Sequence, residues 1–535
     1  MKWWTDWRFP ALVFVLLLPG IFWGLPSAIS VQVDSPVPLG SLLFFADRRP
    51  SINNIYPAFH QLLLLPFYGA AIACYWLAGG ISSITSSWPY GFRSVTGLFS
   101  SFTIITNLVS AIMATVLIRF TLPLVRLHRP WIWFGVLCAA FNCVFIYYGR
   151  TGNLDLPYNF WCAAAMVSLW RFLDQTAGSI RPLLLAGIAA ALAIGSKDQA
   201  AGPVLGMGLA LLFLSKQPWG SRIRHGVIFS AVILAVYAIT AILPHPARWV
   251  EHVRFVTSPH APTPIPATLF GQVLILQHTL RRLIDVYTIP GLLLAAVGAW
   301  TAYRQEHRKF WFLMLPSFAY YGLVIAKTRV AYPRFMLTFL VPYIVFSIYG
   351  AGAVSEWLAA RHRIGRTAWV TLLWAFLAWR LLYGYAPVTY AQVFDIRRQV
   401  AAELPGYVAP GSPLLLSRMQ GGNLPGAGIY ENYRLMLVPG DALVPPSRHA
   451  ASTLYPYDPN VQFLLQGTGG AGLPWHKPIP FPSVPVAPVR EWRYPDWIRE
   501  NLIVPCFYEY YLFRRTGPVP EGYIQKEADL PDNPG

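Results

Sequence analysis

Long apolar segments separated by short polar ones run through the first 385 residues of the chain. A membrane-spanning helix needs about 20 predominantly apolar residues, because the hydrocarbon core of a bilayer is about 30 Å thick. Segments of this kind lie at residues 9–29, 58–78, 98–119, 131–149, 156–173, 182–197, 200–215, 226–243, 284–301, 310–326, 335–352 and 367–385. The pattern predicts an all-α polytopic membrane bundle of about 11 to 13 transmembrane helices.

Basic residues gather in four of the short polar segments. Because cytoplasmic loops carry an excess of Lys and Arg, these segments are predicted to be cytoplasmic. They contain the clusters Arg126/Arg129, Lys216/Arg222/Arg224, Arg304/Arg308/Lys309 and Arg361/Arg363/Arg366. The loops at 30–57, 150–155, 244–283 and 327–334, and everything after residue 386, are then predicted to face outward.

This topology leaves a conflict near the N-terminus. The chain must cross the membrane an odd number of times between an outward residue 30 and an inward residue 121, yet only 58–78 and 98–119 are strong spans. Either one of these two segments is re-entrant, or the Trp- and Gly-containing stretch 79–97 contains a third crossing.

The composition agrees with a membrane protein. Hydrophobic residues make up 55% of the chain and charged residues 12%, which is about half of the charged fraction of a soluble domain. The net charge of +18 lies almost wholly in residues 1–385, with 29 Lys and Arg against 10 Asp and Glu, whereas residues 386–535 hold 12 against 13. Since the basic residues stand between apolar runs and form no basic stripe, we expect no nucleic-acid partner.

The composition changes after Tyr385. Residues 386–535 are polar, rich in Pro and Gly, and contain short strand-like runs at 412–416 and 508–513. The sequence therefore predicts a transmembrane module at 1–385 followed by a small α/β extracytoplasmic domain at 386–535.

Two acids stand out, because charged groups near a membrane are costly and tend to mark function. Asp34 follows the first span, and Asp155 lies in the polar loop between two later spans. Either one alone is explained by capping of a helix or turn that begins at a nearby Pro. Both, however, are expected on the outer side, where they could meet at one water-accessible cavity.

Four cations are predicted on the same side, against the positive-inside bias: Lys197, Lys327, Arg329 and Arg334. Snorkelling towards lipid headgroups explains one or two of them. For the whole set, a phosphate or the two acids would supply the compensating negative charge.

Other polar residues on this side were weighed as ligands. Tyr56 and His60 lie at the start of the second span, where aromatic residues commonly form a belt at the membrane interface. His60 could also line the cavity. His245, Glu251, His252 and His260 share one loop, but their spacing matches no familiar zinc site. No phosphate-binding Gly-rich loop, Gly-x-Ser-x-Gly elbow or Cys-x-x-Cys is present. The sequence requires no cofactor, and a divalent metal stays open as an alternative.

The arrangement of these motifs resembles the GT-C fold glycosyltransferases that use polyprenyl-phosphate sugars, especially the protein O-mannosyltransferase and aminoarabinose transferase branch (glycosyltransferase families 39 and 83). The resemblance covers about residues 10–385. It rests on Asp34 after the first span, Tyr56-Pro57-Ala58-Phe59-His60, Gly149-Arg150-x4-Asp155, Lys197, and Arg329 to Arg334 around Tyr332-Pro333. Ser35 stands where such proteins often have a second acid.

The resemblance implies an enzyme of the bacterial inner membrane with an extracytoplasmic active site. It would transfer a sugar from a polyprenyl-phosphate donor to a glycan, lipid or protein acceptor, with Asp34 as catalytic base and Asp155 in the same cavity. The resemblance also implies that the donor phosphate is bound by Lys197, Lys327, Arg329 and Arg334. Other contacts with the substrate would be made by Arg150, Tyr56, His60 and Tyr332. One base without a carboxylate nucleophile predicts a single displacement with inversion.

Two other classes of function remain as rivals. A transporter or flippase for lipid-linked or small polar substrates would also have many spans, but it is expected to carry charges at mid-depth and often an inverted repeat. A non-catalytic scaffold predicts that the two acids are dispensable.

Overall fold

The computed structural model describes residues 7–23, 25, 56–81, 91–125, 129–174, 179–244, 246–257, 265–361, 363–417, 433–437, 462–469, 486–502 and 507–516. The chain divides into two compact units. The first contains Met1–Ile21, Ser35–Arg93 and Phe102–Ala386, and the second contains Phe22–Asp34, Ser94–Ser101 and Pro387–Gly535.

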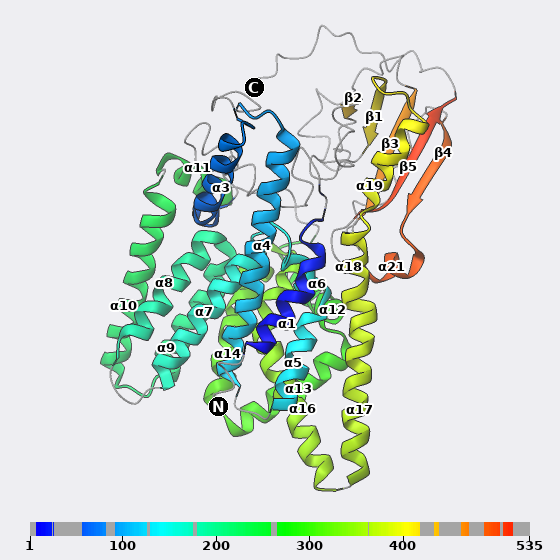
Figure 1. Ribbon diagram of the computed structural model, residues 1–535. Helices are drawn as coiled ribbons and strands as arrows, with labels where there is room; N and C mark the ends of the chain where they lie inside the picture. Colours follow the sequence, from blue (N-terminus) through cyan, green and yellow to red (C-terminus); the bar gives the residue numbers. More distant parts are fainter. Residues whose placement is uncertain are drawn as a thin grey trace. The chain divides into compact units, whose positions relative to one another are not determined.

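The first unit is built of helices, and the prediction of an all-α membrane bundle is confirmed. Figure 1 shows many of these helices lying roughly side by side. They are α1 (Arg8–Leu17), α3 (Phe59–Leu77), α4 (Val95–Thr121), α5 (Arg129–Ala140), α6 (Cys143–Tyr148), α7 (Asp155–Asp174), α8 (Arg181–Ser196), α9 (Ala201–Leu214), α10 (Trp219–Tyr237), α11 (Pro246–Thr257), α12 (Leu269–Tyr287), α13 (Ile289–Gln305), α14 (His307–Tyr320), α15 (Ala326–Thr328), α16 (Leu340–Ala359) and α17 (Arg363–Arg380).

Five helices of the described residues are long and apolar enough to cross a membrane, which makes this a multi-pass membrane protein. They run over Phe59–Leu77, Ser100–Leu124, Trp219–Ile242, His307–Thr328 and Pro333–Ala359. The pair α12 and α13 passes the same test together but is bent by 102°, and four further apolar helices are shorter. Fewer full-length spans are found than the sequence suggests, because some apolar runs are interrupted. The run 131–149, for example, breaks at Asn142, whose side chain accepts hydrogen bonds from Val144 and Phe145 at the start of α6.

The segment 244–283 was expected to be a loop, but it is largely helical, so the expectation of a loop is wrong. It contains α11 and most of α12, and Thr288 separates α12 from α13 with a φ of 66°. Polar residues such as Gln272 and Asp285 interrupt the apolar run of α12, which is why a search for wholly apolar spans misses it. In the stretch 79–97, Ile81 and Phe92 form an antiparallel bridge, and its described residues contain no helix before α4.

Glycines allow two helices of the core to approach closely. A Cβ atom on Gly298 of α13 would lie 1.7 Å from the Phe346 carbonyl oxygen, and one on Gly350 of α16 would lie 2.1 Å from the Leu294 carbonyl oxygen. Any larger side chain at either position would therefore push α13 and α16 apart. Small residues have this role in many membrane bundles, where close packing replaces the hydrophobic drive for helix association.

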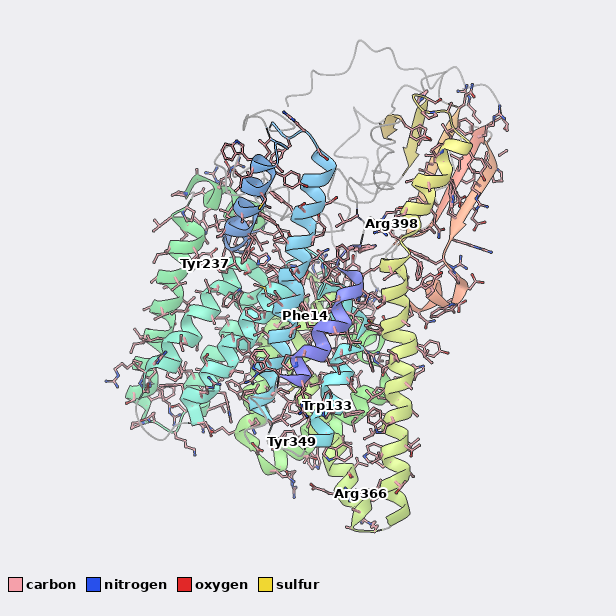
Figure 2. All side chains as sticks on the ribbon, in the orientation of Figure 1. Phe14, Trp133, Tyr237, Tyr349, Arg366 and Arg398 are labelled. Carbon is pink, nitrogen blue, oxygen red and sulfur yellow. The ribbon has the colours of Figure 1, made fainter. Side chains whose placement is uncertain are left out.

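The basic residues at 304–309, which were predicted to lie in a cytoplasmic loop, make specific contacts with neighbouring helices. Arg308 donates to the carbonyl oxygens of Leu214 and Leu173, both at 2.6 Å, and so satisfies carbonyls at the ends of α9 and α7. Lys309 is buried, forms an ion pair with Glu306, and donates to the Tyr349 hydroxyl at 3.0 Å. Figure 2 shows Tyr349 and Arg366 towards the end of this unit that lies opposite Tyr237. We call this end, with its Arg- and Lys-bearing turns, the basic end.

The second unit contains a five-stranded mixed sheet, and the two strand-like runs predicted at 412–416 and 508–513 coincide with two of its strands. The strand order is β2-β1-β3-β5-β4, with β1 parallel to β2 and β3, and β5 antiparallel to β3 and β4. The strands are β1 (Pro413–Ser417), β2 (Arg434–Leu437), β3 (Phe463–Gly469), β4 (Val486–Arg493) and β5 (Phe507–Arg515), and the helices are α18 (Ala386–Val393), α19 (Ile396–Glu403) and α21 (Asp496–Asn501).

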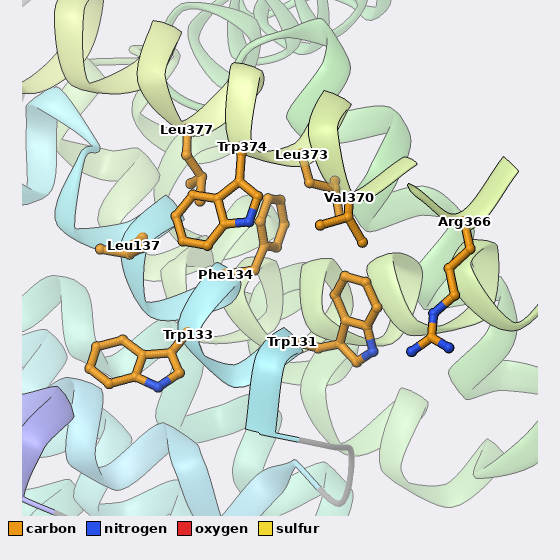
Figure 3. A pocket seen from close by; sticks show the side chains of 9 residues that line it. All are labelled: Trp131, Trp133, Phe134, Leu137, Arg366, Val370, Leu373, Trp374 and Leu377. Carbon is orange, nitrogen blue, oxygen red and sulfur yellow. The ribbon is translucent and has the colours of Figure 1, made fainter. Parts of the chain in front are cut away.

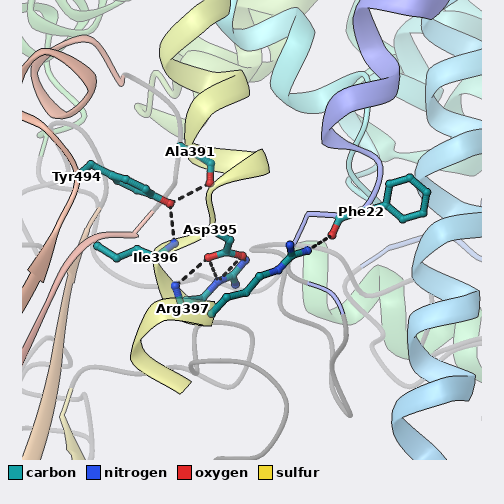
Figure 4. Close-up of polar contacts among 7 residues, drawn as sticks. Phe22, Ala391, Asp395, Ile396, Arg397 and Tyr494 are labelled. Carbon is teal, nitrogen blue, oxygen red and sulfur yellow. Dashed lines mark hydrogen bonds and ion pairs between the residues drawn. The ribbon is translucent and has the colours of Figure 1, made fainter. Parts of the chain in front are cut away.

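A buried polar cluster fixes the start of α19 (Figure 4). Asp395 caps the helix by accepting from the Arg397 backbone N–H at 3.0 Å, and its carboxylate pairs with the Arg397 guanidinium at 2.6 Å. Burial alone would lower the pKa of Arg397, but the charge of Asp395 and its hydrogen bonds, together with the nearby Tyr510 and Tyr494, raise that pKa above its usual value. Arg398 donates to the carbonyl oxygen of Phe22, which belongs to the same unit.

Candidate functional site

Asp155 is the first residue of α7, and its side chain is fully buried. The side chain of Asn153 accepts a hydrogen bond from the Asp155 backbone N–H at 2.7 Å, and Asn159 donates to the Asp155 carbonyl oxygen at 2.8 Å. The beginning of the helix thus has a capping side chain in Asn153. The Asp155 carboxylate, for which capping was one explanation, forms ion pairs.

Lys197 and Arg334 converge on this carboxylate from two different parts of the chain. The Lys197 ammonium lies 2.8 Å from Oδ1, and the Arg334 Nε lies 3.8 Å from Oδ2. Lys197 follows the last residue of α8 and has an extended backbone conformation. Arg334 lies in the 3-10 helix Pro333–Phe339, which precedes α16. The Lys197 side chain is 5% exposed and the Arg334 side chain 19%, so the arginine is the more accessible of the two cations.

Aromatic rings surround the two cations. The Lys197 ammonium lies 5.5 Å from the Tyr56 ring and 5.9 Å from the Tyr158 ring, and the Arg334 guanidinium lies 4.8 Å from the Tyr332 ring. These distances are within the range of cation–π attraction, which strengthens when the cation is withdrawn from water. The phenol rings therefore help to hold both cations in place.

Tyr56 lies just before α3 and is influenced by two acids. Burial raises the pKa of its hydroxyl, and the negative charges of Asp155 and Asp198 raise it further. The phenol stays protonated at neutral pH and can donate a hydrogen bond. Tyr158, one helical turn after Asp155, shares a hydrogen bond with Thr338 at 2.8 Å and donates to the Tyr320 hydroxyl at 3.3 Å.

The remaining predicted site residues have other contacts. Arg150 is fully buried, donates to the Leu16 carbonyl oxygen at 3.4 Å, and lies 5.8 Å from the Tyr385 ring. Arg329 has a left-handed backbone, with φ 54°, and donates to the Ile265 carbonyl oxygen at 2.9 Å. His60 is buried within α3, and Lys327 is exposed on α15. Asp34 lies outside the described residues.

A histidine that the sequence left without a role pairs with an acid beside this cluster. His252 of α11 is buried, and its Nε2 lies 3.1 Å from the Asp198 carboxylate. Asp198 directly follows Lys197, and Trp249 on α11 donates to the Tyr237 hydroxyl of α10 at 3.3 Å. The sequence held one clue to this contact: Trp249 and His252 are three residues apart, which places both side chains on one face of a helix.

Among the described residues, no group of three or more His, Cys, Asp or Glu side chains is placed to hold a metal ion. Glu251, which shares the segment with His252, pairs with Arg248 at 3.3 Å.

Comparison with known proteins finds similarity in structure. No protein-family model matches the chain, and no curated protein matches it. Among solved structures, ArnT from Cupriavidus metallidurans in the apo state is 13% identical, with 86% of this chain and 91% of that chain covered and a TM-score of 0.47. The same protein bound to undecaprenyl phosphate gives 13% identity, coverage of 88% and 94%, and a TM-score of 0.45.

An oligosaccharyltransferase from Archaeoglobus fulgidus is also similar. It is 11% identical, with 87% of this chain and 70% of that chain covered and a TM-score of 0.42. These likenesses are to membrane glycosyltransferases with the GT-C fold. None of them assigns a role to a residue of this chain.

Proposed function

We propose that this protein is an integral-membrane glycosyltransferase that moves a sugar from a polyprenyl-phosphate donor to an extracytoplasmic glycan, lipid or protein. The observation that carries the proposal is the convergence of Lys197 and Arg334 on buried Asp155, at one end of a membrane bundle. Such a site suits a lipid-linked donor, because the polyprenyl tail requires an apolar environment whereas the phosphate and the sugar require a polar one.

The donor phosphate is proposed to bind at Arg334. This guanidinium is partly exposed, and its planar fork can present N–H groups to phosphate oxygens while Nε faces Asp155. Asp155 holds Lys197 and Arg334 before the donor arrives, so that little reorganisation is needed as negative charge develops on the leaving phosphate. Lys327 and Arg329 belong to the turn that precedes Arg334, where they would contribute positive potential at the mouth of the site.

The sugar is proposed to lie against the tyrosines of the cluster. The Tyr56 hydroxyl is a hydrogen-bond donor, and the Tyr332 ring packs beside Arg334. Aromatic rings provide flat apolar surfaces with a polar tip, which suits the faces and hydroxyls of a sugar. Arg150 and His60 are proposed to support this region, Arg150 through its bond to the Leu16 carbonyl.

The reaction is proposed to be a single displacement with inversion. The acceptor hydroxyl attacks the anomeric carbon and gives its proton to the Asp34 carboxylate, while the bond from that carbon to the phosphate oxygen breaks and polyprenyl phosphate leaves with the electron pair. Asp155 pairs with Lys197 and Arg334. Its proposed role is to position the two cations.

The orientation follows from the basic loops. Since Arg- and Lys-rich loops stay in the cytoplasm, the opposite end of the first unit, with Asp155, is proposed to face outward across a bacterial inner membrane, as is the C-terminal domain. Accessibility of single cysteines introduced on α11 and on the α9–α10 loop would test this topology.

The function is tested in proteoliposomes with a panel of radiolabelled polyprenyl-phosphate sugars. The wild-type protein should transfer one of these sugars, and Asp34→Asn should lose transfer while it still binds the donor. The matched control is Asp496→Asn, which removes an acid paired with Arg499 in the second unit. Movement of intact donor across the bilayer without transfer would instead support a transporter, and undiminished transfer by Asp34→Asn would exclude Asp34 as the base.

A further inference from the structure

A cavity of about 810 Å³ lies between α5 and α17, near the basic end of the first unit. Eight of the nine side chains that line it are apolar or aromatic, and the ninth is Arg366 (Figure 3). On α17 the lining residues recur every three or four positions, so they form one stripe along the helix. The result is an elongated groove between two helices with a single cation.

The groove is polar at one end and apolar along the rest. Arg366 and Trp131 stand near the first residues of α17 and α5, and Figure 3 shows the guanidinium and the indole nitrogen at the same end. Leu377 and Leu137 line the other part. The distance along α17 from Arg366 to Leu377 is about 16 Å, from a rise of about 1.5 Å per residue. This length matches one leaflet, which is about half of a hydrocarbon core about 30 Å thick.

The groove is open to the surroundings of the helices. Trp374 on its wall is 59% exposed, and its neighbour Leu372 is 61% exposed. On the same helix Arg380 is buried and donates to the Val286 carbonyl oxygen at 3.0 Å. A helix with exposed apolar residues and a polar contact turned inward is arranged for contact with lipid.

We infer that this groove binds one anionic glycerophospholipid from the leaflet at the basic end, with its phosphate on Arg366 and Trp131 and an acyl chain along Leu373 and Leu377. Charge complementarity selects this occupant, because Arg366 is the charged side chain among the otherwise apolar and aromatic residues that line the groove. Arg361, on the turn before α17, adds positive charge near the same headgroup level. The inference is independent of the proposed function, since Asp155 and Lys197 lie at the other end of the bundle.

The test is native mass spectrometry of the full-length protein, titrated with phosphatidylglycerol or phosphatidylcholine of identical chains. The wild-type protein should bind one phosphatidylglycerol at least tenfold more tightly than phosphatidylcholine. Arg366→Gln should remove about tenfold of that preference, which corresponds to the loss of one charge-assisted contact. Leu373→Trp should fill the groove and weaken both lipids.

The matched control is Arg304→Gln on α13. Arg304 lies 5.7 Å from the Trp300 ring at the same end of the unit, but neither residue lines the groove. An equal loss in the Arg304 and Arg366 variants would overturn the inference, because the preference would then reflect basic charge in general. Equal binding of both lipids by the wild-type protein would also overturn the inference, because the groove would then not select an anionic lipid. A dimer that only Leu373→Trp disrupts would overturn it too, because a second copy of the chain would then occupy the groove.

Discussion

Lys197 and Asp155 are 42 residues apart in the chain, and their side chains meet at 2.8 Å with 5% and 0% of their surfaces exposed. The pair joins the end of α8 to the beginning of α7, two helices that also pack along their length. A buried ion pair seldom adds net stability, because removing two charges from water costs about as much as their attraction returns. Under the proposed function, the pair would serve to position a cation for the donor phosphate.

Removing one partner of this pair should strongly destabilise the protein. Lys197→Met and Asp155→Asn each leave a buried charge without its nearest partner, and a loss of about 3–5 kcal/mol is expected. The double variant Asp155→Asn/Lys197→Met should cost less than the sum of the two single changes. Unfolding by denaturant in mixed micelles would give the four free energies of the cycle.

The control for this cycle is the pair Arg282 and Asp285, which are 3.0 Å apart but 20% and 26% exposed. Breaking it should cost under about 1 kcal/mol. If the Asp155 cycle gave no larger coupling than this partly exposed pair, the buried pair would have no special structural role.

Asp395 should stabilise α19 through two separable effects, a helix cap and an ion pair. Asp395→Asn keeps an oxygen that can accept from the Arg397 backbone N–H, while it removes the charge that faces the Arg397 guanidinium. Asp395→Ala removes both, so it should destabilise α19 further, by about 1 kcal/mol for the lost cap. Hydrogen exchange of the amides at 396–403 should rise in the order wild type, Asp395→Asn, Asp395→Ala.

Asp496→Ala supplies the comparison for α19, since its pair with Arg499 lies on an exposed part of α21. It should leave exchange at 396–403 unchanged. Equal exchange in the Asn and Ala variants of Asp395 would mean that the cap contributes nothing.

The predicted fold and the observed one agree where the sequence signal is strong and local. Apolar runs such as 58–78 and 226–243 became α3 and α10, because about 20 apolar residues can do little else in a membrane protein. α12 was missed because its polar residues interrupt the run, and the break at Asn142 depends on one side-chain cap. Such features are decided by tertiary packing and single hydrogen bonds, which hydropathy does not contain.

The candidate site shows the same division. Lys197, Arg334 and Asp155 were predicted together because each ends a helix or begins one on the same side, and that is a property of topology. Arg150 stands only five residues before Asp155, yet its side chain contacts the Leu16 carbonyl and the Tyr385 ring. The direction of a loop side chain depends on contacts distant in the chain, so the sequence alone did not separate it from the cluster. The pairing of His252 with Asp198 was missed for the same reason.

Arg334 should set the affinity for the lipid phosphate. Arg334→Gln removes the charge and should weaken binding of polyprenyl phosphate by about tenfold or more, whereas Arg334→Lys keeps the charge but loses the planar fork and should be intermediate. Binding can be followed by titration of the detergent-purified protein with a short-chain polyprenyl phosphate. Arg248→Gln on α11 is the charge control, because Arg248 pairs with Glu251 and is not one of the cations that pair with Asp155. Unchanged affinity in Arg334→Gln would assign the phosphate to another cation.

The close contact of α13 and α16 should make Gly298 intolerant of even one additional methyl group. A Cβ atom there would lie 1.7 Å from the Phe346 carbonyl oxygen, so Gly298→Ala must move the helix backbones apart and should cost about 1–3 kcal/mol or more. Gly208→Ala on α9 is the matched control, because no atom lies within 4 Å of the added Cβ and helix propensity favours Ala by about 1 kcal/mol. Thermal unfolding in detergent should therefore shift down for Gly298→Ala and stay level or rise for Gly208→Ala. Equal shifts in the two variants would show that α13 and α16 are not held at this separation.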